Sequence, residues 1–365
     1  MSDDTARVAL IGLGGIAQHG HIPDYIGDSR IDLIAGADPA AEARQRALEA
    51  GVPRVYDNYR QMLDRERVDF VSVLTPMWTH GDICCACAER GLHILCEKPL
   101  ATDWAMAQRI ADCVHSNGVK FRVSYNYRFF VDAMRARQDI VSGEIGHVFY
   151  IDFAENANFS WSSSGRRKQL GLPTVNQPFW GHPEDHPPAT RLMIIDKNTH
   201  YIDMARYLVG ADVESVYAQM GYHGSHPEVG ENFTNLMLVM SNGTRVRDLH
   251  NWGCHFWDRR GVMLSAATKI EGEAGTIRIE RTPGQTGTYR LYRENELVSL
   301  VEYPEQAEAS SFAASFHELV DAVREGREPM NGIEENMHEM KVVEACYESA
   351  RTNQVVRIDQ IQLSD

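Results

Sequence analysis

An aspartate and a histidine lie one helical turn apart in the segment IIDKNTHYIDMARYLVG. Asp196 and His200 are spaced i, i+4, at the point where an amphipathic pattern begins. Side chains at this spacing in a helix lie on the same face. Histidine titrates near neutral pH and is the side chain used most often as a general acid or base. The pattern therefore allows two interpretations, a helix start with a polar face or an acid–base pair presented to a substrate.

On a helical wheel, the same segment separates into an apolar stripe and a polar stripe. The apolar stripe consists of Ile195, Ile202, Ala205 and Val209, and the polar stripe of Asp196, His200, Asp203 and Tyr207. A polar stripe most often faces water, and an acid near the helix N-terminus is favoured by the helix dipole. This segment alone does not decide between the two interpretations.

A lysine follows a buried strand elsewhere in the chain. The segment HILCEKPLAT places Glu97, Lys98 and Pro99 at the C-terminal end of the fourth strand that the sequence predicts. Lysines that begin loops are commonly solvated charges. In open α/β sheets, however, ligands bind in the crevice outside the carboxyl ends of the strands. Pro99 restricts the backbone there, so Lys98 is predicted to reach a bound ligand.

The first predicted strand runs into a glycine-rich turn with the pattern Gly12-x-Gly14-x-x-Ala17. Gly12 permits a tight turn, Gly14 lets a pyrophosphate approach the backbone, and the small Ala17 allows close packing of helix against strand. Gly15 and Ile16 complete the turn at a helix N-terminus, where backbone amides bind phosphate. We therefore predict a dinucleotide site here.

An acid ends the second predicted strand, in IAGAD. Asp38 would hydrogen-bond the adenosine ribose hydroxyls and repel a 2′-phosphate. The sequence thus favours NAD over NADP as the cofactor. Arg44 is the residue that could weaken this preference.

The elements that position these residues change in kind near Gly143. Before it, apolar runs alternate with helical patterns of about 10–15 residues, which predicts a doubly wound parallel sheet covered on both faces. After it, successive strand patterns with Asn-Gly and other glycine turns predict a mostly antiparallel sheet. Strong helical patterns remain only near Asp196 and from about Glu305 onward.

Composition argues against several classes of function. The 365 residues carry a formal net charge of -15, which disfavours a nucleic-acid surface. No apolar run approaches the ~20 residues of a membrane span. The N-terminal stretch MSDDTARVALIG is acidic and does not resemble a signal peptide. We expect a cytoplasmic protein with no nucleic-acid or membrane partner.

The chain contains seven cysteines, an odd number. This count predicts reduced thiols rather than a disulfide framework. Cys84, Cys85 and Cys87 lack the paired C-x-x-C spacing of zinc sites and lie among alanines in a helical pattern. We therefore expect them to be small buried core residues rather than metal ligands.

Taken together, these motifs resemble the Gfo/Idh/MocA oxidoreductases, a family named for glucose–fructose oxidoreductase and inositol dehydrogenase. The resemblance covers essentially the whole chain and rests on GLGGIAQ, TPMWTHGDICCACAERGLHILCEKPLA, DKNTHYIDMARYLVG and GIEENMHEMKVVEACYESARTNQVVRI. It implies an NAD-binding Rossmann domain (1–143) and a substrate-binding α/β domain with a large, open, mainly antiparallel sheet (144–330). A C-terminal helix and strand (331–365) would pack back on the Rossmann domain. The outer face of the second sheet often joins subunits in this family, which implies a homodimer or homotetramer.

The resemblance maps Lys98, Asp196 and His200 onto the catalytic trio of the family. It implies an NAD-dependent dehydrogenase acting on a secondary hydroxyl of a sugar, sugar derivative or cyclitol. His200 is our first choice of general base, and Lys98 would stabilise the reacting oxygen, although these roles could be exchanged. Asp196 would orient His200 or hold a neighbouring hydroxyl.

Two alternatives stay open. One is a glycosidase- or lyase-like enzyme in which tightly held NAD oxidises the sugar transiently and permits elimination. The other is a non-catalytic nicotinamide-sensing regulator, which the intact trio disfavours.

Further residues are predicted to line the two halves of the site. Those at the cofactor are Thr75, Pro76, His80, Glu97 and Asn126, together with Lys98 on the nicotinamide side. Those at the substrate are Tyr127, Arg128, Asn158, Trp161 and Lys197, together with Lys98, Asp196 and His200. Asn158 and Trp161 lie in a long irregular segment, where an aromatic face would stack on a sugar or anchor the loop. Family members commonly carry glycines around this aspartate and histidine, whereas this chain has Lys197 and Asn198, which leaves the identity of the substrate open. No metal is predicted, because prolines flank His182, Asp185 and His186.

Overall fold

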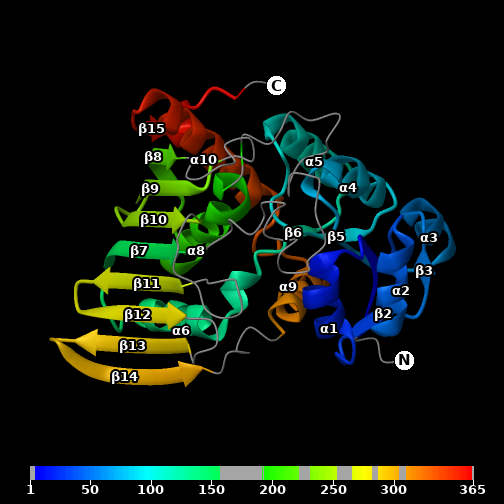
Figure 1. Cartoon of the computed structure of the whole chain (residues 1–365), viewed down its shortest axis with the longest axis horizontal. Coiled ribbons are helices and arrows are strands. Elements are labelled where there is room, and N and C mark those ends of the chain that lie inside the picture. Colours follow the sequence, from blue (N-terminus) through cyan, green and yellow to red (C-terminus); the bar gives the residue numbers. More distant parts are fainter. Residues whose placement is uncertain are drawn as a thin grey trace, which may run out of the picture. The chain divides into compact units, whose positions relative to one another are not determined.

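The computed structural model describes residues 5–156, 191, 193–221, 231–252, 265–281, 287–303 and 310–363. The chain divides into two compact units, each with its own sheet (Figure 1). The first unit contains Met1–Phe129 and Ala309–Met340, and the second contains Phe130–Glu308 and Lys341–Leu363.

Six parallel strands form the sheet of the first unit, in the order β3-β2-β1-β4-β5-β6. They are β1 (Ala6–Ile11), β2 (Ile31–Ala37), β3 (Val55–Tyr56), β4 (Phe70–Val73), β5 (His93–Cys96) and β6 (Phe121–Val123). This confirms the predicted doubly wound sheet. The order reverses between β1 and β4, the position where such sheets bind ligands. Only β3 was not predicted, because a strand of two residues carries no periodic signal.

Helices cover both faces of this sheet, and a hydrophobic core lies under each set. The helices are α1 (Ile22–Tyr25), α2 (Ala41–Glu49), α3 (Tyr59–Arg65), α4 (His80–Ala88), α5 (Trp104–Asn117), α9 (Ser311–Glu325) and the start of α10 (Ile333–Thr352). One core involves α3, α4, α5 and α10, and the other involves α1, α2 and α9. Burial of both sheet faces explains why these strands are apolar throughout.

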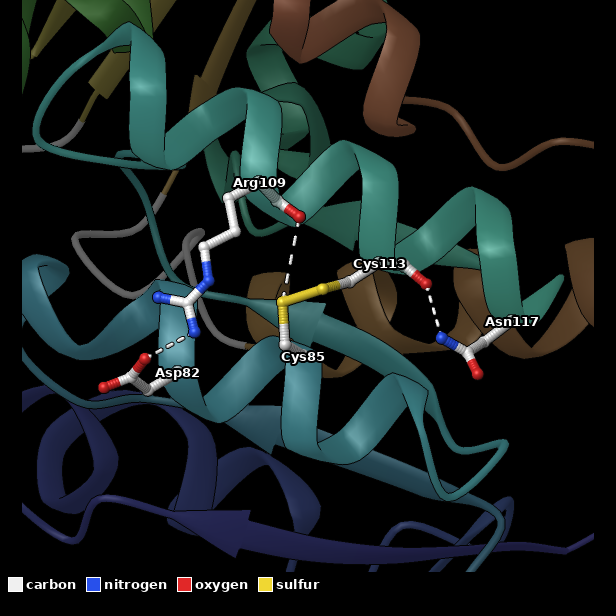
Figure 2. The surroundings of a disulfide bond; sticks show 5 residues. All are labelled: Asp82, Cys85, Arg109, Cys113 and Asn117. Carbon is white, nitrogen blue, oxygen red and sulfur yellow. Dashed lines mark hydrogen bonds and ion pairs between the residues drawn. A yellow bond between two sulfur atoms is a disulfide. The ribbon is translucent and has the colours of Figure 1, made fainter. Parts of the chain in front are cut away.

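A disulfide joins α4 and α5, which lie side by side in Figure 2. Cys85 and Cys113 have Cα atoms 5.3 Å apart, and an Asp82–Arg109 ion pair of 2.7 Å links the same helices. The expectation that the cysteines are reduced is therefore wrong for Cys85 and Cys113. Sequence could not reveal the pair, because helix packing brings together cysteines separated by 28 positions. One argument for a cytoplasmic protein is thereby lost.

The expected burial of the cysteines on α4 is confirmed. Cys84, Cys85 and Cys87 lie inside the first unit as small core residues. Among the described residues, no helix is long and apolar enough to cross a membrane.

In the described part of the second unit, nine strands form one sheet, seen as a ladder from β15 to β14 in Figure 1. They are β7 (Val148–Asn156), β8 (Val213–Gly221), β9 (Phe233–Met240), β10 (Arg245–Asn251), β11 (Ser265–Gly272), β12 (Gly275–Arg281), β13 (Gly287–Arg293), β14 (Glu296–Tyr303) and β15 (Val356–Arg357). Neighbouring strands are antiparallel except β7 and β10. The mainly antiparallel sheet is as predicted, and the Asn242-Gly243 turn joins β9 to β10.

Helices α6 (Val131–Val141) and α8 (Thr199–Val209) pack on one face of this sheet. On α6, Asp139 accepts a hydrogen bond of 2.6 Å from the Tyr289 hydroxyl of β13. On α8, Tyr201 donates to Glu155 of β7. Residues on this face of the strands are buried, and they alternate with more exposed ones on the opposite face.

The compact units divide the chain differently from the predicted domains. Helix α6 lies before the predicted boundary at residue 143 but belongs to the second unit, because it packs on β13. Helix α9 belongs to the first unit, where Phe316 contacts Tyr25 and Phe70. The C-terminal strand β15 was expected on the Rossmann domain. It pairs instead with β8 and extends the second sheet.

Candidate active site

The turn after β1 has the open backbone that a dinucleotide phosphate requires. Gly12 has a positive φ of 95°, and a Cβ atom there would lie 2.8 Å from the Leu74 carbonyl carbon. A Cβ on Gly14 or Gly15 would meet no atom within 4 Å. Ala17 is fully buried against the sheet. The backbone conformation and the contact with Leu74 thus require a glycine at position 12. Gly14 and Gly15 leave space for a ligand.

Asp38 lies against this turn. Its Oδ2 accepts a hydrogen bond of 2.8 Å from the Leu13 amide, and its Oδ1 accepts one of 2.8 Å from the Ala40 amide. A carboxylate oxygen has more than one acceptor position, so both oxygens can still receive ribose hydroxyls. Arg44 donates to the carbonyl oxygens of Asp38 and Pro39, each at 2.8 Å, and therefore stays beside the carboxylate.

The segment after β5 is held by a buried carboxylate. Glu97 Oε1 lies 2.9 Å from His21 Nε2, and Glu97 Oε2 accepts a hydrogen bond of 3.1 Å from the Lys98 amide. Burial alone would raise the pKa of Glu97, but the hydrogen bond and charge of His21, with Lys98, outweigh it and lower the pKa. The charged Glu97 thus fixes the backbone at Lys98. Lys98 itself is half-buried and precedes a cis peptide bond to Pro99.

His21 was not recognised from the sequence. Its ring is fully buried, with Nδ1 3.3 Å from the Tyr25 hydroxyl, which lies 3.0 Å from Ser72 Oγ. The Phe312 ring lies 4.6 Å from it, centroid to centroid. His21 therefore connects the helix after the glycine turn to the segment that carries Lys98. Nothing in the residue pattern indicated this, since His21 and Glu97 are 76 positions apart.

His80 contacts the same segment through its ring nitrogens. Its Nε2 lies 3.0 Å from the Thr75 carbonyl oxygen, and its Nδ1 lies 3.1 Å from that of Pro99. Burial lowers the pKa of His80, so the ring is neutral at pH 7 and only one of the two nitrogens donates. The ring is fully buried, whereas Thr75 is half-buried and Pro76 exposed. His80 therefore joins two strand ends, and its contact with a cofactor stays a prediction.

The turn after β6 completes this edge of the sheet. Asn126 is buried and donates a hydrogen bond of 3.0 Å to Ser311 Oγ. Arg128 is buried and lies 3.3 Å from a Glu335 carboxylate oxygen, while Tyr127 is half-buried. Because all six strands are parallel, the segments after β1, β2, β4, β5 and β6 lie along one edge. The predicted cofactor residues and Lys98 follow these strand ends.

In the second unit, Asp196 lies in a buried turn and His200 at the start of the helix that follows it. A π-helical turn (Ile194–Asn198) leads directly into α8. Asp196, His200 and Asp203 are only 5%, 6% and 1% exposed. Asp196, His200 and Asp203 therefore do not face water as a solvated helix surface would, and their roles in a reaction stay a prediction.

The start of the turn is fixed by side chains from other elements. The Ile194 amide donates to Glu231 Oε1 at 3.0 Å, and the Tyr347 hydroxyl of α10 donates to the same oxygen at 2.8 Å. Arg191 donates to Glu344 of α10 at 2.9 Å. These contacts anchor the turn to α10 at the point where it begins.

Lys197 is buried against the sheet. Its Nζ lies 3.0 Å from Glu155 Oε2 of β7, and the residue is 9% exposed. The charge that the sequence places beside Asp196 is thus neutralised by a carboxylate. Direct contact of Lys197 with a substrate stays a prediction.

Several predicted residues lie outside the described part of the chain. They are Asn158, Trp161, His182, Asp185 and His186.

The chain matches the two models of one protein family. Residues 6–125 match the GFO_IDH_MocA oxidoreductase family, NAD-binding Rossmann fold, and residues 137–358 match its C-terminal alpha/beta domain. The chain is 25% identical to D-apiose dehydrogenase from Paraburkholderia graminis, over 97% of this chain and 90% of that protein. It is 24% identical to D-glucoside 3-dehydrogenase from Escherichia coli, over 98% of this chain and 99% of that protein.

The fold is also similar to that of a solved oxidoreductase from Agrobacterium radiobacter, crystallised with NAD+, L-tartaric acid and magnesium. The TM-score is 0.79 at 19% identity, covering 97% of this chain and 98% of that one. This likeness concerns the fold. With both family models matched in order along the chain, the protein belongs to the Gfo/Idh/MocA oxidoreductases, with an NAD-binding Rossmann domain followed by the C-terminal α/β domain of that family.

Proposed function

We propose that this protein oxidises a secondary hydroxyl group of a sugar, sugar derivative or cyclitol, with NAD as hydride acceptor. The observation that carries the proposal is the burial of Asp196 and His200 on one turn, in a family member with Lys98 at a strand end of its Rossmann sheet. Two relatives that match nearly its whole length are named as dehydrogenases of D-apiose and of D-glucosides, which supports the substrate class.

The residues of the first unit suit NAD. Open space at Gly14 and Gly15 would admit the pyrophosphate, and Asp38 would receive the ribose hydroxyls. Bound NAD would supply the hydride acceptor at its nicotinamide ring.

The side chains would handle the proton and the charge. His200 takes the hydroxyl proton as hydride leaves the same carbon, because histidine is the side chain used most often as a general acid or base. The Lys98 ammonium donates a hydrogen bond to that oxygen and stabilises its developing negative charge. Asp196 orients the imidazole or holds a neighbouring hydroxyl. In this proposal both Lys98 and His200 act on one substrate oxygen.

A panel of sugars, glycosides and inositols with NAD tests the proposal by the absorbance of reduced nicotinamide. We expect NADH to accumulate with at least one compound. Tight NAD binding with no NADH from any compound would contradict the proposal. Cleavage of a glycoside without net NADH would favour transient oxidation and elimination instead.

The NAD preference is tested at Asp38. We expect Asp38→Ser to lower kcat/KM for NAD about 10- to 100-fold, because the charge-assisted hydrogen bonds to the ribose are lost. The same variant should use NADP better, because a repelling carboxylate is gone and Arg44 remains beside the site. Steady-state kinetics with both cofactors measure this. Arg44→Ala in the same background should remove the gain with NADP, and an unchanged NAD:NADP ratio in Asp38→Ser would refute the assignment.

We also propose that the protein is a homodimer or homotetramer joined through the face of the nine-stranded sheet opposite α6 and α8. Alternation along the strands assigns Met237 and Leu300 to this face, where both apolar side chains are exposed. Light scattering should give two or four times the mass of the chain, and a monomer would contradict the proposal.

A further inference from the structure

A buried ion pair that the mechanism above does not use joins Lys197, which follows Asp196 in the turn, to Glu155 of β7. Lys197 Nζ and Glu155 Oε2 are 3.0 Å apart, and Glu155 is only 2% exposed. The Tyr201 hydroxyl donates to the same carboxylate oxygen at 2.7 Å, and Lys197 Nζ lies 5.8 Å from the Tyr201 ring centroid. One carboxylate on β7 therefore holds Lys197 of the turn and Tyr201 of α8.

Glu155 is ionised although its side chain is buried. Burial alone would raise its pKa, but the charges of Lys197 and His250 and the hydrogen bond from Tyr201 outweigh burial and lower it. Glu155 is thus a carboxylate at neutral pH. A buried carboxylate is a strong and directional acceptor, because few solvent dipoles compete for it.

The neighbouring strand holds the turn through a second carboxylate. Asp248 of β10 accepts a hydrogen bond of 2.7 Å from Asn198 Nδ2 and lies 2.6 Å from His250 Nε2. Asn198 in turn accepts from Thr234 Oγ1 at 3.0 Å. Consecutive residues of the turn, Lys197 and Asn198, are therefore fixed to adjacent parallel strands.

Residues that contact Glu155 alternate with the proposed catalytic residues along the turn and the start of α8. Lys197 and Tyr201 are spaced i, i+4, as are Asp196 and His200, and the two pairs are offset by one residue. One residue corresponds to about 100° around a helix. Any rotation that removed Lys197 and Tyr201 from Glu155 would therefore turn Asp196 and His200 by the same angle.

A buried ion pair contributes little to stability on balance, since desolvation of both charges offsets their attraction. In some proteins, buried ionic groups instead select one geometry among several. We propose that Glu155 and Lys197 are positioning residues for hydride transfer, because their ion pair fixes the rotation of the turn that presents Asp196 and His200. The inference rests on the function proposed above and extends it to two residues that need not touch the substrate.

Three variants test it with the substrate found in the panel: Glu155→Gln, Lys197→Met and the double variant. Each single variant should melt several degrees lower, because it leaves one buried charge unpaired. The double variant should recover the wild-type melting temperature, because neither charge remains. In all three, kcat should fall roughly 10- to 100-fold, since small misplacements of reacting groups have effects of this size. The KM values for substrate and NAD should stay within about threefold.

A deuterium isotope effect supplies a readout that a purely structural role would not move. With substrate deuterated at the reacting carbon, the effect on kcat should grow in the double variant, because hydride transfer becomes the slow step. Lys197→Arg, which keeps the ion pair, should recover part of kcat.

The matched control is Asp132→Asn, which breaks the ion pair between Asp132 of α6 and Arg281 of β12 in the same unit. It should lower the melting temperature and leave kcat unchanged. A double variant with wild-type kcat would overturn the positioning role, and a rise in KM alone would make Lys197 a substrate contact instead. If the wild type gave no NADH with any compound, the proposed function would fail and the positioning role with it.

Discussion

We expect Lys98→Met to lower kcat/KM for the hydroxyl substrate by about 10³-fold, the size expected when a preorganised cation no longer meets the charge that develops on the reacting oxygen. The lysine is half-buried and its backbone is fixed by Glu97, so another cation cannot readily take its place. NAD binding should change little, because in the proposed binding mode the turn after β1 would hold the phosphates and Asp38 the adenosine ribose. Stopped-flow kinetics and a fluorescence titration with NAD measure the two quantities.

Lys120→Met is the matched control. Lys120 directly precedes β6 and pairs with Glu328, so it lies at the amino edge of the same sheet, opposite the strand ends that carry Lys98. Its loss should leave kcat/KM unchanged. If Lys98→Met retained wild-type turnover while NAD stayed bound, Lys98 would have no part in the reaction.

The sequence reports most directly those features that depend on one residue and its immediate neighbours. The parallel sheet could be predicted because its strands are apolar on both faces, and the glycine turn because its backbone geometry depends on residue type. The short strand β3 and the packing of α6 on the second sheet could not be predicted. The first has too few residues to show a period, and the second depends on contacts with strands far along the chain.

The partners of the candidate site residues could not be predicted from the sequence, for a related reason. The residue types and spacing of Asp196 and His200 identify them as candidates, yet only the fold shows that they are buried. His21 with Glu97, and Glu155 with Lys197, are pairs between segments that nothing in the local pattern links. The fold brings the oppositely charged residues of each pair together. The same is true of the Cys85–Cys113 disulfide, which counting cysteines did not predict.

Gly12→Ala and Gly14→Ala should affect the protein in different ways, although both lie in the same turn. At Gly12 a methyl group meets the Leu74 backbone at 2.8 Å, and φ is 95°, where an L-residue is disfavoured by about 1–2 kcal/mol before that contact is counted. Gly12→Ala should therefore lower the melting temperature of the protein without any ligand.

At Gly14 a methyl group meets no protein atom within 4 Å, so the melting temperature of Gly14→Ala without ligand should equal that of the wild type. Its methyl group would enter the space proposed for the pyrophosphate, so NAD affinity should fall by about tenfold or more. Since a ligand stabilises by its affinity for the folded state, melting curves with and without NAD separate the two effects. The wild type should gain several degrees with NAD, and Gly14→Ala should gain almost none. Equal stabilisation of both by NAD would mean that the pyrophosphate does not approach Gly14, and the cofactor would then have to bind elsewhere on the sheet edge.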